Sequence, residues 1–389
     1  MKPKKPDRDF AAQKAAYLFC ERQLTQQQIA EFLEVSQSLV SRLLAKAEDE
    51  GWLERKYRFV PKGLSPAREE ELRRVAEPKG LVELLAGLTS DNGVRVRAPH
   101  VVESGPGGTS ARAFERRFKA FGRSVGVVLM DVLASSDTFG VTWGRTISHV
   151  VDSLADIPRP QATGRPIRFV PVCGEPLDQA SNRDTSSHLV ERLHRLLQPG
   201  APPPPSLTGV PALISRNFRG ADERGIRKFV THAASYRVVF GKRSPLINQV
   251  DSLLTSVGAA EHPMGFIHDE LLRAGSTPGR RLTKDTLARL VAGDIGGVLI
   301  PRRDLDAAGR KEVESLNAMW TGMKRQHLER IARHAVRSDH PGVIAVSMGG
   351  TNRAEVIAEA LRCGLVNELI IDRELAGALT RLLAPSSGR

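Results

Sequence analysis

The chain has 389 residues, of which 41% are hydrophobic and 26% are charged. This length predicts two or three domains with real cores, and the composition excludes a disordered tail, a collagen-like fibre and a small disulfide scaffold. Lysine and arginine number 57 against 44 acidic residues, a net charge of +13 that favours polyanionic partners. The cysteines Cys20, Cys173 and Cys363 are far apart and odd in number, so we expect a reduced, intracellular protein.

The N-terminal segment, Met1 to Asp9, is charged and no apolar stretch follows it, which argues against a secretory signal. No run approaches the roughly 20 apolar residues that span a bilayer, since Val125 to Leu133 is short and contains Asp131. We therefore expect a cytoplasmic protein without a membrane partner. The charge does not locate a nucleic-acid-binding region, because Met1 to Lys62 holds 12 basic and 9 acidic residues and most of the excess lies beyond it.

Residues 11–50 have the periodicity and caps of three helices. The first is Ala11 to Cys20. The second begins at Thr25, which is spaced to form a capping box with Gln28, and the third runs from Gln37 to Glu50 with Ser36 as its cap and Gly51 after its end. The residues expected to be buried are Ile29, Ala30, Phe32 and Leu33 in the second helix and Leu39, Val40, Leu43, Leu44 and Ala47 in the third.

Two short helices joined by a turn of three or four residues are typical of the helix-turn-helix motif. Glu34 stands where glycine usually supplies the left-handed turn conformation, a departure of modest cost. The start of the third helix would reach base edges in the major groove, and later basic residues would meet phosphates. The residues predicted to bind DNA are Thr25, Gln26, Ser36, Gln37, Ser38, Ser41, Arg42 and Lys46. The alternative is a helical protein-interaction module with a solvated polar face.

Three regions follow from these patterns. Residues 1–60 are interpreted as the DNA-binding domain, winged-helix-like because Trp52 to Val60 alternates as a strand does. Residues 61–80 are interpreted as a linker that contains a charged helix, Ala67 to Ala76. Residues 81–389 are interpreted as an effector-binding and oligomerisation domain.

From Leu81 onward, short β-branched runs alternate with helical stretches, which predicts a doubly wound α/β domain with a mainly parallel sheet. The expected strands are Val94–Arg97, Thr138–Thr142, Ile167–Val172, Tyr236–Phe240, Gly297–Ile300, Val343–Val346 and Glu368–Ile371. The expected helices are Ala111–Val132, Thr146–Leu154, Thr185–Leu197, Thr283–Val291, Arg353–Arg362 and Arg373–Leu383. The proline-rich segment Gln198 to Pro205 is interpreted as a stiff loop inside this domain.

One candidate ligand loop is Gly140 to Thr146, which joins a strand to a helix. Ligands of such sheets bind beyond the carboxyl ends of the strands, where loops lead into helix N-termini. Gly144 allows close backbone approach, Thr146 offers a hydroxyl group and Arg145 offers charge to a phosphate. Glycine at such a turn is also common for steric reasons alone.

A second candidate loop, Ser347 to Arg353, has the same strand-to-helix placement. Gly349 and Gly350 free the backbone amides, and Arg353 in the first helical turn adds a guanidinium group to the helix dipole. Asp294, just before an expected strand, could bind sugar hydroxyls, or could simply cap the amides of its own turn.

Catalytic and metal-binding patterns are weak. Ser347 follows a strand as in a nucleophile elbow, but Ala345 replaces the first glycine, and no histidine and acid can be assigned to it. His327 and His334 are two helical turns apart without a third ligand at a recognisable spacing. We predict no catalytic residue, no metal and no cofactor.

The order of motifs resembles the SorC family of bacterial sugar-responsive transcriptional regulators over nearly the whole chain. The segments that carry this resemblance, after the helix-turn-helix, are Gly122–Thr146, Val170–Gly174, Gly293–Ile295, Gly349–Gly364 and Ile370–Ala376. Trp143-Gly-Arg-Thr146, and Gly349-Gly350 followed by Ala354-Glu-Val-Ile357, are its most specific parts.

The resemblance implies an effector domain related to sugar-phosphate isomerases and deaminases but used for sensing. It implies a homodimer or homotetramer that holds double-stranded operator DNA and responds to a phosphorylated sugar. The residues that it assigns to the effector pocket are Trp143, Gly144, Arg145, Thr146, Gly174, Glu175, Asp294, Gly349, Gly350 and Arg353. Arg353 replaces the family's usual lysine, and Phe240 to Pro245 replaces its usual Gly-Ile-Gly, which leaves the identity of the sugar open.

We therefore predict a DNA-binding transcriptional regulator controlled by a small effector. Its heads would read half-sites about 34–36 Å apart, or multiples of that spacing. The alternative is a sugar-phosphate isomerase or deaminase with a DNA-binding head, in which Asp294 would be the base without an assigned partner. A third reading is a structural module that binds DNA without any effector.

Overall fold

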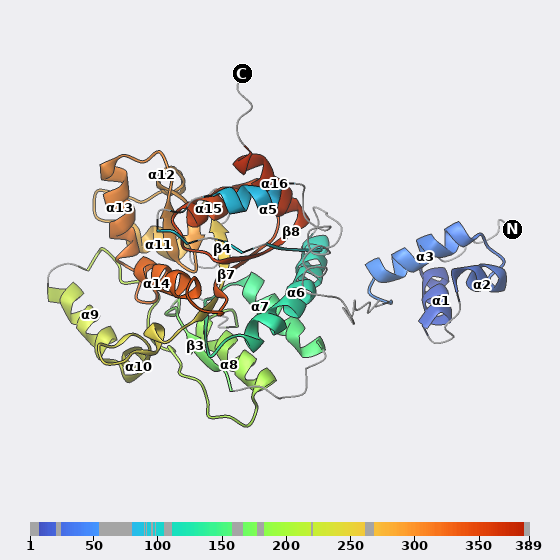
Figure 1. The fold of residues 1–389 in the computed structure, drawn as a ribbon, viewed down its shortest axis with the longest axis horizontal. Helices are drawn as coiled ribbons and strands as arrows, with labels where there is room; N and C mark the ends of the chain where they lie inside the picture. The colour runs from blue at the N-terminus through green and yellow to red at the C-terminus, as the bar shows by residue number, and fades with distance from the viewer. Residues whose placement is uncertain are drawn as a thin grey trace, which may run out of the picture. The chain divides into compact units, whose positions relative to one another are not determined.

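The computed structural model in Figure 1 describes residues 8–20, 25–53, 80–88, 90, 92–94, 96–97, 99–104, 111–157, 166–176, 183–218, 221–260 and 268–384. The chain divides into two compact units, Met1–Glu69 and Glu70–Arg389. The expected domain limits at residues 60 and 80 stay predictions, because residues 54–79 lie outside the described ones. The helix expected at Ala67–Ala76 and most of the strand expected at Trp52–Val60 fall in that range as well.

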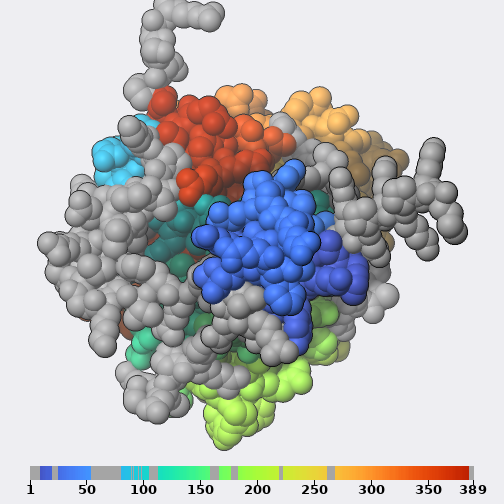
Figure 2. All heavy atoms as spheres, turned by 90° about the vertical axis from the view of Figure 1, so that its right-hand side faces the viewer, coloured from blue at the N-terminus to red at the C-terminus, as the bar shows by residue number. Residues whose placement is uncertain are grey.

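The first unit contains helices α1 (Arg8–Cys20), α2 (Gln26–Phe32) and α3 (Gln37–Asp49), which share one small apolar core. They form a single blue body in the space-filling view (Figure 2). The expected caps are present: the Gln28 N–H donates to Thr25 Oγ1 (3.3 Å) and the Thr25 N–H donates to Gln28 Oε1 (2.9 Å). The Leu39 N–H donates to Ser36 Oγ (3.3 Å), so local capping sets both helix starts.

The turn between α2 and α3 forms without glycine. Glu34 has a φ of 54°, the left-handed conformation expected at its position. Ile29 and Ala30 are buried as expected, but Phe32 is 68% exposed and the expectation that it is buried is wrong. Two residues along a helix rotate a side chain by about 200°, so Phe32 faces away from Ala30. Trp52 and the buried Leu53, the described part of the expected strand, are not in a strand.

The described part of the second unit contains an eight-stranded sheet. Six strands are parallel neighbours in the order β1-β8-β7-β4-β2-β3, and a β5–β6 hairpin extends β4 in antiparallel fashion. The strands are β1 (His100–Val102), β2 (Thr138–Val141), β3 (Arg168–Pro171), β4 (Ser252–Ala259), β5 (Val291–Ile295), β6 (Val298–Pro301), β7 (Gly342–Ser347) and β8 (Glu368–Asp372). The predicted mainly parallel sheet is confirmed.

Helices cover both faces of this sheet, so its strands are buried on both sides. Along β4, Leu253 belongs to one apolar core and Leu254 to the other. On the Leu254 side lie α6 (Ala111–Ala134), α7 (Arg145–Ser153) and α8 (Ser186–Leu197), and on the Leu253 side lie α5 (Leu81–Gly87), α11 (His268–Gly275), α12 (Lys284–Leu290), α13 (Ala307–Asn317), α14 (Arg325–Ala335), α15 (Thr351–Arg362) and α16 (Arg373–Leu383). Figures 1 and 2 both place α5 against α16.

The remaining helical elements are α9 (Ala221–His232), α10 (Ala234–Phe240) and the short 3-10 turns Leu154–Asp156 and Leu246–Asn248. Helix α10 corrects the strand expected at Tyr236–Phe240, where a short run of β-branched and aromatic residues is compatible with either state. The described residues of Val94–Arg97 form no strand; the edge strand β1 begins at His100. No helix among the described residues has the length and apolar character needed to cross a lipid bilayer.

Candidate functional site

The residues predicted to contact bases lie on the exposed surface of α3 and its cap. Ser36, Gln37, Ser38, Ser41 and Arg42 are all exposed, and the spacing of the last four places them along one side of the helix. The Arg42 Nε–H donates to the Ser38 carbonyl (3.3 Å), so this side chain lies along its own helix.

The other three candidates in the head differ in their roles. Thr25 is exposed and Gln26 is half-buried at the start of α2. Lys46 forms an ion pair with Asp9, which ties α3 to α1. Lys46, which the sequence predicts to contact DNA, therefore also links two helices of the head.

In the second unit, the loop from β2 to α7 is built around a buried tryptophan. Trp143 is 4% exposed, and its ring centroid lies 5.6 Å from that of Trp320. Gly144 has φ 122° and ψ 153°, a conformation that is almost restricted to glycine. A Cβ atom on Gly144 would lie 3.0 Å from Ser256 Oγ within β4, so this glycine lets the loop after β2 approach β4 closely.

Asp294 faces the same strand ends from the β5–β6 hairpin. Its Oδ2 accepts a hydrogen bond from the Gly297 N–H (2.9 Å). Burial raises the pKa of Asp294 to about 6, although this hydrogen bond opposes the rise. A Cβ atom on Gly297 would meet the Trp143 ring at 3.0 Å and the Trp320 ring at 3.5 Å. The hairpin therefore brings a carboxyl group with a raised pKa close to the tryptophan pair.

Two polar groups along these strand ends are buried without a hydrogen-bond partner in the described part of the chain. They are Trp320 Nε1, beside Trp143, and Ser347 Oγ at the end of β7. Buried donors without a partner carry a large desolvation cost, which a ligand hydroxyl or a water molecule can relieve. The carboxyl ends of β2, β4 and β7 thus present unused hydrogen-bonding capacity.

The loop from β7 to α15 has its glycine amides occupied by carboxylates. The Gly349 N–H donates to Asp372 Oδ1 (2.9 Å) and the Gly350 N–H donates to Glu374 Oε1 (3.4 Å). Asp372, fully buried at the end of β8, also accepts from Arg117 of α6 (2.7 Å). Arg117 pairs with Glu374 as well. The amides expected to hold an anion do hold anionic groups, and these belong to the protein itself.

Three arginines converge on this loop. Burial lowers the pKa of Arg353, the neighbouring Arg145 and Arg117 lower it further, and Asp372 and Glu374 act in the opposite direction. The Arg353 guanidinium donates to the Met348 carbonyl and, at 3.4 Å, to the Gly349 carbonyl. Arg353 therefore supports its own loop and adds to the positive charge around it.

The structure separates the predicted effector residues into two groups. Trp143, Gly144 and Asp294 lie with Trp320, while Gly349, Gly350 and Arg353 lie with Arg117, Asp372 and Glu374. Arg145, exposed at the start of α7, adds its charge to the second group.

The other three predicted effector residues are not brought to either group by a side-chain contact. Thr146 is half-buried in the first turn of α7. Glu175 forms a backbone bridge to Pro211, and Gly174 packs so closely on Pro211 and Thr321 that a Cβ atom would lie 2.6 Å from each. Gly174 and Glu175 thus form the wall that joins β3 to the Trp320 segment.

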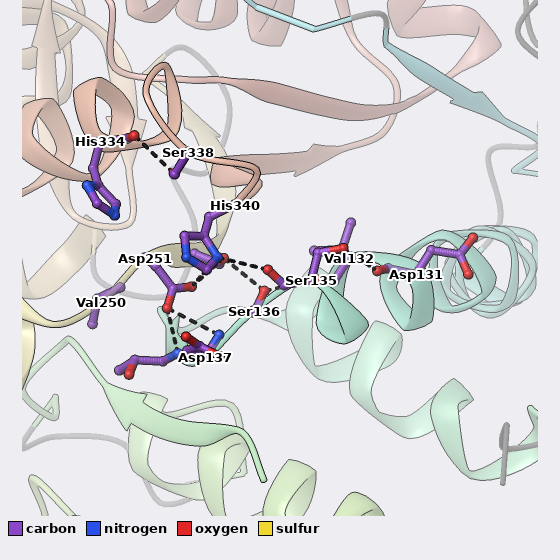
Figure 3. Close-up of polar contacts among 12 residues, drawn as sticks. Asp131, Val132, Ser135, Ser136, Asp137, Val250, Asp251, His334, Ser338 and His340 are labelled. Atoms are coloured by element: carbon purple, nitrogen blue, oxygen red, sulfur yellow. Dashed lines mark hydrogen bonds and ion pairs between the residues drawn. The ribbon is translucent and has the colours of Figure 1, made fainter. Parts of the chain in front are cut away.

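At the opposite, amino-terminal edge of the sheet, Asp137, Asp251 and His340 each place one ligand-type atom within 4.8 Å of the others (Figure 3). Asp251 Oδ2 accepts from the Thr138 N–H (2.7 Å), and Oδ1 accepts from the Ser252 hydroxyl (2.7 Å). These bonds tie the starts of β2 and β4 together, so Asp251 has a structural role that requires no metal ion.

The comparisons with known proteins agree with both halves of this description. Residues 20–58 match the model of the MarR family. No curated protein matches the chain in sequence. Among solved structures, the full-length sorbitol operon regulator SorC from Klebsiella pneumoniae is similar at 19% identity with a TM-score of 0.52, over 97% of this chain and 99% of the other.

Two further solved structures are similar over about four fifths of this chain. A DeoR family transcriptional regulator from Listeria monocytogenes is similar at 15% identity and TM-score 0.52, over 79% of this chain and 99% of its own. A domain assigned to sugar binding in a transcriptional repressor from Vibrio fischeri is similar at 18% identity and TM-score 0.51, over 80% and 100%. This chain therefore has the fold of the sorbitol operon regulator over almost its whole length: a helix-turn-helix head followed by a largely parallel α/β domain, as its resemblance to the SorC family implies.

Proposed function

We propose that this protein is a transcriptional regulator whose head binds an operator and whose α/β domain binds a small effector, a phosphorylated sugar. The observation that carries the proposal is that one chain holds two features. One is a capped helix-turn-helix with an exposed polar face, and the other is a sheet edge that offers arginines and, among the described residues, buried donors without partners. The similar structures named as sugar-binding domains and operon regulators support it.

The phosphate of the effector would bind at the β7–α15 loop. The start of α15 offers the positive end of a helix dipole, the Gly350 N–H and the charges of Arg353 and Arg145. Glu374, whose side chain is 56% exposed, holds the Gly350 amide weakly at 3.4 Å. An incoming phosphate would displace this carboxylate and keep the same donors.

The sugar body would extend toward the tryptophan pair. Its hydroxyl groups would donate to Asp294 and bond with Trp320 Nε1 and Ser347 Oγ, two buried groups that lack a hydrogen-bond partner among the described residues. Aromatic side chains with a few fixed polar groups are a common arrangement in small-ligand pockets. The effector would then prefer one arrangement of the oligomer, with a coupling to DNA affinity of about 1–3 kcal/mol.

The test is operator binding, measured with DNA from upstream of the protein's own gene across a panel of sugar phosphates at fixed salt. One compound that shifts the affinity supports the sensor and names its ligand class. Sequence-specific binding that no compound shifts would contradict the effector half of the proposal. Turnover of any compound in the panel would favour an isomerase or deaminase instead.

Arg353→Ala is expected to abolish the response to the active compound while leaving operator affinity unchanged, because it removes the charge of the phosphate loop and the bonds that support this loop, and leaves the head intact. Arg353→Lys keeps the charge without the planar fork and should respond at higher concentrations. An unchanged response in Arg353→Ala would place the phosphate elsewhere.

Arg42→Ala is expected to cost roughly 1–3 kcal/mol of binding to the operator and little on unrelated DNA. The measurement is a pair of binding curves at the same salt concentration. An equal loss on both DNAs would identify Arg42 as a phosphate contact, and no loss on either would remove it from the interface. Asp49→Asn, an exposed position at the end of α3, is the control.

A further inference from the structure

A basic cavity lies at the far end of α15 from the effector loop. It has a volume of about 390 Å³, and its walls include Arg302, Arg303, Arg310, Arg325, Glu359 and Arg362. These residues come from the loop after β6, from α13, from the start of α14 and from the last turns of α15. Four separate elements therefore direct arginines into one concavity.

The carboxylates around the cavity compensate only part of this charge. Arg302 pairs with Glu355, Arg325 with Glu329 (2.8 Å) and Arg362 with Glu359. Arg303 and Arg310 have no carboxylate partner among the described residues; Arg310 donates only to the Arg303 carbonyl (2.9 Å). Five guanidinium groups against three carboxylates leave two positive charges that the described part of the protein does not neutralise.

We propose that this cavity binds a small phosphorylated compound through a phosphate or diphosphate group. Two unpaired guanidinium groups match the charge of a phosphate dianion, and planar guanidinium forks bind phosphate oxygens in pairs. The volume lies at the lower end of the range of about 300–1,000 Å³ that is usual for small-ligand sites. A concave site of this size suits a compact ligand better than the long backbone of a nucleic acid.

This cavity is separate from the effector site. Arg353 and Arg362 lie nine residues apart on α15, or roughly 14 Å along the helix axis. None of the residues proposed for the effector lines this cavity. The inference therefore goes beyond the proposed function and can succeed or fail without it.

Cys363 supplies a probe inside the cavity. It lines the wall and is partly exposed, whereas Cys173 is buried. The full chain would be treated with a neutral maleimide with and without inorganic pyrophosphate, and labelling of each cysteine would be read by peptide mass spectrometry. Pyrophosphate is expected to slow Cys363 labelling at least fivefold in a saturable manner. Sodium chloride at equal ionic strength should not reproduce this effect.

The variants separate the two sites. The double variant Arg303→Ala/Arg310→Ala, at exposed positions that do not support the core, should lose the protection. Arg281→Ala, an exposed arginine outside the cavity, and Arg353→Ala should both retain it. Protection that is absent in the wild type, unaffected in the double variant or lost in Arg353→Ala would overturn the proposal. Duplex DNA that protects Cys363 better than pyrophosphate would also overturn it.

Discussion

The loops before α7 and before α15 look alike in sequence and differ in structure. Each follows a parallel strand, contains glycine and places an arginine at the start of a helix. Before α7, Gly144 donates to the backbone carbonyl of Asp184 (3.0 Å) and serves close packing against Ser256. Before α15, Gly349 and Gly350 donate to the side chains of Asp372 and Glu374.

The difference shows that glycine has two distinct uses at these turns. One loop uses it for space, and its amide is satisfied by another backbone group. The other uses it to expose amides to anions, and two carboxylates with Arg117 occupy that position. Anion binding is therefore expected at the second loop, whereas the first contributes shape.

Among the substitutions that test this difference between the loops, Asp372→Asn should have the largest effect on stability. The substitution removes a fully buried charge that pairs with Arg117 and bonds to the Gly349 amide. Loss of one partner from a buried ion pair leaves the other uncompensated, so we expect unfolding of the α/β domain to become easier by about 3 kcal/mol. Urea denaturation measures this, with the exposed Asp304→Asn as control. A loss below about 1 kcal/mol would mean that Glu374 alone neutralises Arg117.

Gly144→Ala tests the use of glycine for space. Its φ of 122° and ψ of 153° disfavour any side chain, and the new Cβ atom would press on Ser256 Oγ, so a destabilisation of about 1–3 kcal/mol is expected. Gly225→Ala, in α9 with open space around it, should instead be neutral or slightly stabilising. Equal denaturation midpoints for the two variants would refute the packing role of Gly144.

Asp294→Asn should change the pH dependence of stability. Because burial raises the pKa of Asp294 to about 6, the folded protein binds this proton more tightly than the unfolded chain does. The resulting stabilisation is fully present below about pH 4, the value for an unfolded aspartate, and is lost as the pH rises through about 6. Asparagine stays neutral, so the stability of the variant relative to the wild type should increase as the pH rises from about 4 to about 6. Unfolding measured at a series of pH values tests this. Parallel curves would contradict the raised pKa.

Glu374→Gln should have the smallest effect, and its sign is informative. If the effector phosphate displaces this carboxylate from Gly350, removing the competing charge should tighten binding of the active compound. Since the Glu374 side chain is 56% exposed, we expect a gain of roughly two- to fivefold in a titration. Weaker binding would show that Glu374 takes part in holding the ligand. Glu314→Gln, exposed on α13, provides the matched control.

The head could be predicted from the sequence in detail because its determinants are local. The Thr25–Gln28 capping box, the Ser36 cap and the left-handed Glu34 all lie within a few residues of the groups they satisfy. The larger sheet was predicted in outline, but its central strand β4 was not. Ser252–Ala259 contains serine, threonine and glycine among its apolar residues, and only neighbours distant in sequence make it a strand.

The candidate site was predicted in part for the same reason. The glycine loops and Asp294 stand at strand ends, which a sequence pattern can indicate. Arg117 lies in the second turn of a long amphipathic helix, and Trp320 lies in a segment without regular structure. Their roles depend on how α6 and the segment after α13 pack against parts of the chain that are distant in sequence. A local sequence pattern cannot predict such packing.

The pairing of β1 with β8 has a consequence for protein synthesis. His100 to Val102 pair with Ile370 to Asp372, so the first strand of the sheet cannot form this pairing until the last strand has been translated. The head, built from contacts within residues 8–53, can fold as soon as it leaves the ribosome, at roughly 5–20 residues per second. A nascent or prematurely ended chain would thus possess a folded head before its sheet is complete. If the head binds an operator as proposed, that binding would precede control by any ligand.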